Sequence, residues 1–246
     1  WFWNFGDGAT STEQHPEHTY TTPGTYTVSL TASNAYGEDT ETKTDYITIL
    51  EPPAAAFSAT PTEGNAPLAV QFTDESTGNV TSWNWDFGDG ATSTEQNPIH
   101  TYTVPGTYTV SLTASNAYSN DTTTKTDYIT ILSPPVAAFN ATPTEGNAPL
   151  AVQFTDESTG DITDWFWDFG DGSTSTDQSP SHTYTTPGTY TVSLTAANTY
   201  GNDTETKTAY IAVLAPPVAN FTANVTEGNA PLAVQFNDTS TGNVTA

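Results

Sequence analysis

Residues 107–115 read Thr-Tyr-Thr-Val-Ser-Leu-Thr-Ala-Ser, and this stretch decides the fold class. Hydroxyl side chains alternate in it with apolar ones, and the apolar positions are Tyr108, Val110, Leu112 and Ala114. Because successive side chains of a strand point to opposite faces, the pattern predicts an antiparallel strand with one buried face.

Other short stretches carry the same alternation and are separated by turn signals. The inward sets are Leu68, Val70 and Phe72; Trp83, Trp85 and Phe87; and Ile129 and Ile131. The expected turns are Thr62–Asn65, Gly88–Gly90 and Pro105–Gly106. About seven short strands without helical periodicity predict an all-β fold, a two-sheet sandwich of immunoglobulin type.

The pattern recurs with a period of 82 residues, which predicts tandem domains. The spacing is kept by Trp3, Trp85 and Trp167, by His18, His100 and His182, and by the lysines Lys43, Lys125 and Lys207. The expected domains are the C-terminal part of a repeat at 1–50, complete repeats at 51–132 and 133–214, and the N-terminal part of a repeat at 215–246.

Proline pairs open the repeats at Pro52-Pro53, Pro134-Pro135 and Pro216-Pro217. Proline fixes φ and cannot join a central strand, so these pairs predict short, stiff junctions and an end-to-end stack of domains. Joining Ala246 to Trp1 would continue the repeat without a gap, so we expect both terminal parts to be completed. Either the native polypeptide is longer, or neighbouring copies donate strands to each other.

The segment Trp85–Gly90, Trp-Asp-Phe-Gly-Asp-Gly, resembles the signature of the PKD domain family, and Trp167–Gly172 repeats it. The segments His100–Val110 and Gly64–Phe72 are also similar to that family, and the likeness extends over the whole chain. The resemblance implies extracellular or cell-surface arrays that act as spacers, protein–protein modules or surface-layer components, which are common in archaeal surface proteins.

Composition excludes several functions. The chain has 28 acidic and 3 basic residues, a net charge of −25 and no cysteine. Nucleic acids and anionic membranes are bound through Lys and Arg, so neither is an expected partner. Disulfides and thiolate metal sites are impossible. No apolar run is long enough to cross a bilayer, so this segment is not expected to insert in a membrane.

An enzyme would need a site such as a triad of His100, Asp89 and Ser93. These residues are equally expected in a scaffold, because a Gly-Asp-Gly turn uses its aspartate to bind nearby backbone amides. The same set occurs in every repeat, which favours the structural interpretation. We therefore expect no catalytic residue, no enzyme activity and no required cofactor.

Calcium is a possible ligand, since carboxylate oxygens suit it. The candidate ligands are Asp74, Glu75, Asp156 and Glu157. Some PKD domains bind calcium through a D-x-D-G loop before the tryptophan strand, but this chain has Glu75–Gly78 there, with two ligand positions altered. Diffuse counterions around so acidic a chain are the alternative.

Two further residue sets are candidates for surface roles. Eight sequons make glycosylation a prediction, at Asn79, Asn120, Asn140, Asn202, Asn220, Asn224, Asn237 and Asn243. Aromatic residues outside the predicted core are candidates for self-association, or for covering a sandwich edge: Phe2, Phe166, Tyr36, Tyr118 and Tyr200.

The favoured function is a structural segment of an extracellular filament, sheath or surface-layer protein, assembled end to end as a stiff rod. Its partners would be copies of itself or neighbouring repeats, with attached glycans possible. The alternative is a stalk, spacer or binding module of a cell-surface adhesin or secreted hydrolase. Both place the protein outside the cell or on its surface.

Overall fold

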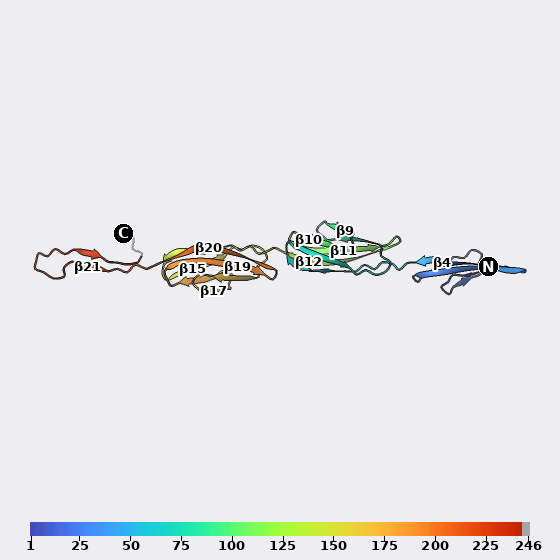
Figure 1. The fold of residues 1–246 in the computed structure, drawn as a ribbon, viewed down its shortest axis with the longest axis horizontal. Helices are drawn as coiled ribbons and strands as arrows, with labels where there is room; N and C mark the ends of the chain where they lie inside the picture. The colour runs from blue at the N-terminus through green and yellow to red at the C-terminus, as the bar shows by residue number, and fades with distance from the viewer. Residues whose placement is uncertain (243–246) are drawn as a thin grey trace. The chain divides into compact units, whose positions relative to one another are not determined.

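A computed structural model describes residues 1–242. The described residues form strands and turns without any helix, which confirms the all-β prediction, and so contain no helix able to cross a membrane. Contacts divide the chain into two units, Trp1–Glu63 with Pro67–Thr130 and Gly64–Ala66 with Ile131–Ala246. Figure 1 labels the strands of both.

The complete repeat of the first unit is a sandwich of two sheets. One sheet has three strands in the order β10-β7-β5, and the other has five in the order β6-β12-β11-β8-β9. The strands are β5 (Phe57–Thr60), β6 (Glu63–Asn65), β7 (Leu68–Asp74), β8 (Ser82–Asp86), β9 (Thr92–Ser93), β10 (Ile99–Tyr102), β11 (Gly106–Ser115) and β12 (Asn120–Leu132).

The complete repeat of the second unit has the same topology. Its sheets have the orders β13-β15-β18 and β14-β20-β19-β16-β17. The strands are β13 (Phe139–Thr142), β14 (Glu145–Asn147), β15 (Leu150–Asp156), β16 (Asp164–Asp168), β17 (Thr174–Ser175), β18 (Ser181–Tyr184), β19 (Gly188–Asn198) and β20 (Gly201–Leu214).

The core of each sandwich is built from the alternating residues and is centred on one tryptophan. Trp167 is fully buried, with its ring centroid 5.2 Å from Phe139 and 5.5 Å from Phe154. In the other complete repeat Val110 and Leu112 are also fully buried, as their alternation predicts. Burial of these aromatic rings supplies much of the stability of a small domain without disulfides.

One predicted turn is wrong. Glu63–Asn65, expected within a turn, form the short strand β6 at the edge of the five-stranded sheet. The corresponding strand β14 pairs in parallel with β20. A three-residue edge strand is too short to show an alternation, so its sequence could not be told from a turn. With β6 and the two-residue β9, a complete repeat has eight strands rather than about seven.

A β-bulge shapes the last strand of each repeat. The register between β19 and β20 shifts between Tyr190 and Val192, and Ala209 has a φ of 52°. The bulge changes the alternation, so that Lys207 and Tyr210, three positions apart, face the same side. Asp127 adopts the same conformation in the other complete repeat, with a φ of 49°.

The first and last parts of the chain contain fewer strands. The N-terminal sheet has the order β2-β1-β3-β4, and near the other end β21 pairs with β22. These strands are β1 (Phe2–Asn4), β2 (Thr10–Ser11), β3 (Gly24–Asn34), β4 (Gly37–Ile49), β21 (Phe221–Ala223) and β22 (Phe236–Asp238).

Candidate functional site: a polar clamp on the edge strand

Each complete repeat has an edge strand whose outer backbone groups need partners. Strand β13 is at the edge of the three-stranded sheet, and β5 has the same place in the other repeat. An uncovered edge presents a row of free N–H and C=O groups that invites pairing with another chain. In both repeats, side chains from the last long strand, β20 or β12, reach these groups.

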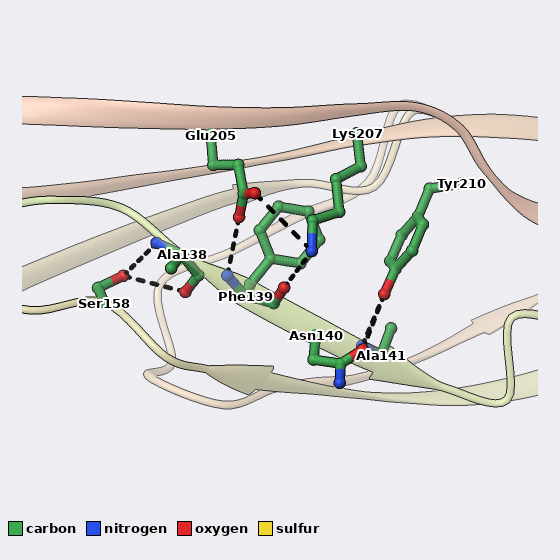
Figure 2. A network of polar contacts seen from close by, with 8 residues as sticks. All are labelled: Ala138, Phe139, Asn140, Ala141, Ser158, Glu205, Lys207 and Tyr210. Atoms are coloured by element: carbon green, nitrogen blue, oxygen red, sulfur yellow. Dashed lines mark hydrogen bonds and ion pairs between the residues drawn. The ribbon is translucent and has the colours of Figure 1, made fainter.

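In the repeat of residues 133–214, four side chains of one strand hold the edge (Figure 2). The backbone N–H of Ala137 donates to Asp203 Oδ2 at 2.8 Å, and that of Phe139 donates to Glu205 Oε2 at 2.8 Å. Lys207 Nζ donates to the Phe139 carbonyl. We call the set Asp203, Glu205, Lys207 and Tyr210 the edge clamp.

The lysine of the edge clamp also contacts two aromatic rings. Lys207 Nζ lies 4.6 Å from the Phe139 ring centroid, 5.1 Å from that of Tyr210 and 3.8 Å from Glu205 Oε1. Partly desolvated cation–π contacts contribute about 0.5–2 kcal/mol each, and hydrogen bonds to charged groups about 1.5–3 kcal/mol. The lysine therefore ties the two sheets together at their common edge.

The tyrosine completes the edge clamp at the far end of β13. The N–H of Ala141 donates to the Tyr210 hydroxyl oxygen at 3.1 Å, and this hydroxyl donates to Asn140 Oδ1 at 2.9 Å. Figure 2 shows the tyrosine and the lysine reaching down to the same strand, as the bulge at Ala209 allows.

The repeat of residues 51–132 has the same arrangement with one change. The N–H of Ala55 donates to Asp121 Oδ2 at 2.8 Å, and Lys125 Nζ donates to the Phe57 carbonyl at 2.7 Å. Tyr128 accepts from the N–H of Ala59 at 3.0 Å. The position of Glu205 is taken by Thr123, so the carboxylate of the edge clamp is missing.

The histidines lie at a different place and hold a turn. His182 Nε2 is 2.7 Å from Asp171 Oδ2, and the imidazole stacks on Phe169 at 4.3 Å. Burial opposes ionisation of Asp171, but hydrogen bonds from His182 and Ser173 outweigh it and lower the pKa of this carboxyl. Tyr184 packs edge-on against the histidine, and burial raises the pKa of its hydroxyl.

The hypothetical triad is not assembled in the structure. His100 Nε2 contacts Asp89 Oδ2 at 2.7 Å, whereas Ser93 Oγ accepts the N–H of Glu95 at 3.2 Å. Gly88 has a φ of 82°, and a Cβ there would lie 2.3 Å from the Thr109 carbonyl oxygen. The Gly-Asp-Gly segment is thus a turn packed against a strand, and its aspartate binds the N–H of Ala91 at 3.0 Å.

The calcium candidates already have protein partners. Asp74 Oδ2 accepts Trp83 Nε1 at 2.7 Å and Gln96 Nε2 at 3.0 Å, while Glu75 Oε1 accepts the Ser58 hydroxyl at 2.6 Å. Asp156 repeats the contacts of Asp74. Within residues 1–242, no three acidic or histidine side chains come close enough to hold a metal ion. A calcium site at these residues or at Glu157 stays a prediction.

The self-association candidates are exposed. Phe2 and Phe166 lie opposite the buried tryptophans of their strands and expose 48% and 50% of their surface. Tyr118 and Tyr36 are almost fully exposed at hairpin turns, and Tyr200 is 46% exposed. Whether this set mediates association stays a prediction.

The sequons differ in how their asparagines are used. Asn120 and Asn202 begin exposed strands, whereas Asn79, Asn140, Asn220 and Asn224 accept backbone hydrogen bonds. Asn237 is exposed in β22, and Asn243 lies outside the described residues. Their glycosylation also stays a prediction.

Sequence reasoning did not identify the edge clamp. A usable signal was present, because Asp203, Glu205 and Lys207 alternate on one face of a predicted strand and the chain has one lysine per repeat. The interpretation also needed the strand order, which shows that these side chains lie beside an open sheet edge.

Comparisons with known proteins agree with the geometry. The family profile described as PKD domain matches residues 1–49, 51–131 and 132–213. The chain is 43% identical over 58 residues to collagenase ColA of Bacillus cereus, a match that covers 24% of this chain and 6% of the collagenase. It is 39% identical over 75 residues to a microbial collagenase of Vibrio alginolyticus, covering 28% of this chain and 9% of that protein.

Solved structures show similar folds. The PKD1 domain of Epp from Vibrio anguillarum is 32% identical, matching 34% of this chain and 99% of that domain, with a TM-score of 0.29. The titin I-band fragment I67–I69 is 14% identical, with a TM-score of 0.57 over 86% of this chain and 87% of the fragment. The profile matches cover most of the chain, which therefore belongs to the PKD domain family.

Proposed function

We propose that this chain is a structural segment of an extracellular filament, sheath or surface layer, in which PKD repeats in series carry tension. The observation behind the proposal is the edge clamp, which joins the first strand of a complete repeat, β13, to its last strand, β20.

The position of the edge clamp matters for tension along the chain. A pull on the chain enters a repeat just before Phe139 and leaves it after Leu214, at the two strands that the clamp connects. Separating them requires the loss of several side-chain hydrogen bonds and the cation–π contacts together. Such a joint resists stretching better than bonds that open one after another.

The place of the proposed work is supported by composition and by the relatives. A cysteine-free, acidic, threonine-rich chain suits an exposed surface. The relatives include collagenases and a pre-pro-metalloprotease of Vibrio cholerae, of which this chain matches less than a tenth. These relatives favour the alternative function, a spacer or stalk that carries another domain of a secreted hydrolase or adhesin.

The proposed mechanical role can be tested by stretching single molecules of the chain. Each complete repeat should unfold in one step and release about 25 nm of chain, as expected from about 3.4 Å per residue over the 82-residue period. Lys207→Met should lower the unfolding force of one repeat, and Phe166→Asn, on the exposed face, should leave it unchanged. Equal forces for the wild type and Lys207→Met would contradict the mechanical role of the edge clamp.

Antibodies against residues 51–132 would separate the two functions on native cell-surface material. Labels repeated along a filament, or spread through a sheet, support the structural proposal. Labels confined to short stalks that end in another domain would replace it with the spacer function.

A further inference from the structure

The N-terminal sheet leaves open the face that the complete repeats bury. Trp3, Val28 and Leu30 are only partly buried, while their counterparts Trp167, Val192 and Leu194 are completely buried. In the complete repeats this face is covered by the three-stranded sheet, which residues 1–50 do not include. The open face forms a groove lined by Trp3, Phe5, His18, Tyr20, Val28 and Ile47.

The polar residues of the edge clamp are also present beside this groove. Asp39, Glu41, Lys43 and Tyr46 occupy the positions of Asp203, Glu205, Lys207 and Tyr210. Lys43 Nζ is 4.6 Å from the Tyr46 ring centroid, so the lysine–tyrosine contact is already formed. What these side chains would bind in a complete repeat is the backbone of an edge strand.

The segment after Leu214 carries the matching surface. Strands β21 and β22 pair Phe221 with Asp238 in the register in which β13 and β15 pair Phe139 with Asp156. Phe221 is 67% exposed and Phe236 is 61% exposed. Their counterparts Phe139 and Phe154, which cover the core tryptophan, are 1% and 0% exposed.

We propose that the open face of the N-terminal sheet in one copy binds residues 215–242 of a second copy. Phe221 and Phe236 would cover Trp3, as their counterparts cover Trp167. Asp39, Glu41, Lys43 and Tyr46 would hold the outer edge of β21.

A second copy is the occupant because every copy offers both surfaces, which differ from each other and so join head to tail. Such heterologous contacts build open chains rather than closed dimers. A further repeat joined covalently to either surface would compete with this contact. The proposal deepens the proposed function by naming a partner, but it rests on two surfaces and not on the mechanical role.

The first experiment measures the mass of the 246-residue chain by sedimentation from low to high micromolar concentration. We expect the average mass to rise at least twofold, with a blue shift of tryptophan emission as Trp3 is covered. The control is a permuted chain in which residues 215–246 precede Trp1, because it has the same composition but three covalently complete repeats. It should stay monomeric.

Two variants locate the contact, and each removes one of the two surfaces. Lys43→Met combined with Trp3→Ala disables the sheet, and Phe236→Ala combined with Phe221→Ala disables the segment. Each double variant alone should bind itself at least tenfold more weakly. An equimolar mixture should form one-to-one pairs, since each variant retains the surface that the other lacks.

Three results would overturn the proposal: a monomeric wild-type chain at the highest concentration, equal association of the permuted chain, or no pairing in the mixture. None of them would affect the proposed function, because repeats joined covalently carry tension without this contact. Equal unfolding forces for Lys207→Met, conversely, would leave the contact between copies standing.

Discussion

The N-terminal sheet and the five-stranded sheet of residues 133–214 have the same strand pairing but different surroundings. Val28 pairs with Lys43 and Val192 with Lys207, and both sheets shift register at the same bulge. Only the second sheet buries its tryptophan completely and holds an edge strand. Strand pairing in this family is therefore local, whereas the core and the edge clamp need both parts of a repeat.

The largest expected effect is the loss of the core tryptophan. Trp167→Ala should destabilise its repeat by about 3–5 kcal/mol, because it removes a fully buried ring. Trp3→Ala should cost less than about 1 kcal/mol, because that ring is only partly buried. Hydrogen exchange of the β19 and β3 amides measures each effect in its own region. Equal losses would mean that the two sheets are equally dependent on their tryptophans.

The next effect concerns a carboxylate that the complete repeat half-buries. Burial opposes ionisation of Asp156, but hydrogen bonds from Ser158, Gln178 and Trp165 lower its pKa. At neutral pH, Asp156→Ala should cost about 2 kcal/mol, because Trp165 and Gln178 lose their acceptor.

The same carboxylate predicts a pH dependence. Since the folded-state pKa is below the unfolded value of about 3.9, its stabilisation is present above about pH 4 and is lost as the pH falls through the folded pKa. Melting temperatures between pH 7 and pH 3 test this, and Asp156→Ala should flatten the acid limb. Asp238→Ala, in the exposed counterpart, serves as the control. An unchanged acid limb in Asp156→Ala would assign the pH dependence to other groups.

A smaller effect distinguishes the two complete repeats. Glu205→Thr copies Thr123 into the edge clamp and should cost about 1 kcal/mol, because the N–H of Phe139 loses its carboxylate acceptor. The reverse change, Thr123→Glu, should stabilise the repeat of residues 51–132 by a similar amount. Hydrogen exchange of β13 and β5 reports both. Opposite signs would show that the carboxylate costs more in desolvation than its contacts return.

The smallest effect is expected on the outer face. Phe166→Asn copies Asn84 and should change stability by less than about 0.5 kcal/mol, because half of the Phe166 side chain is exposed. Sedimentation of this variant also tests the self-association set. If its association equals that of the wild type, Phe166 is not part of a contact between copies.

Much of the fold followed from the sequence, because the inward positions of strands such as Gly106–Ser115 alternate without interruption. Strand β6 was missed because three residues show no period. The edge clamp was missed because its residues bind backbone groups that are about 66 to 69 positions away in the chain. Local patterns record which face of a strand is apolar, but they do not record which strand lies beside it.

The inward position of the lysines has a consequence for how chains meet in solution. Lys125 and Lys207 are half-buried over aromatic rings, and the sequence has no arginine to replace them outside. The outer surface of a complete repeat is therefore a polyanion without its own counterions. Two such surfaces repel each other over about 10 Å at 0.1 M salt. Side-by-side bundling should accordingly respond to the cations of the medium, and steeply so for divalent ones.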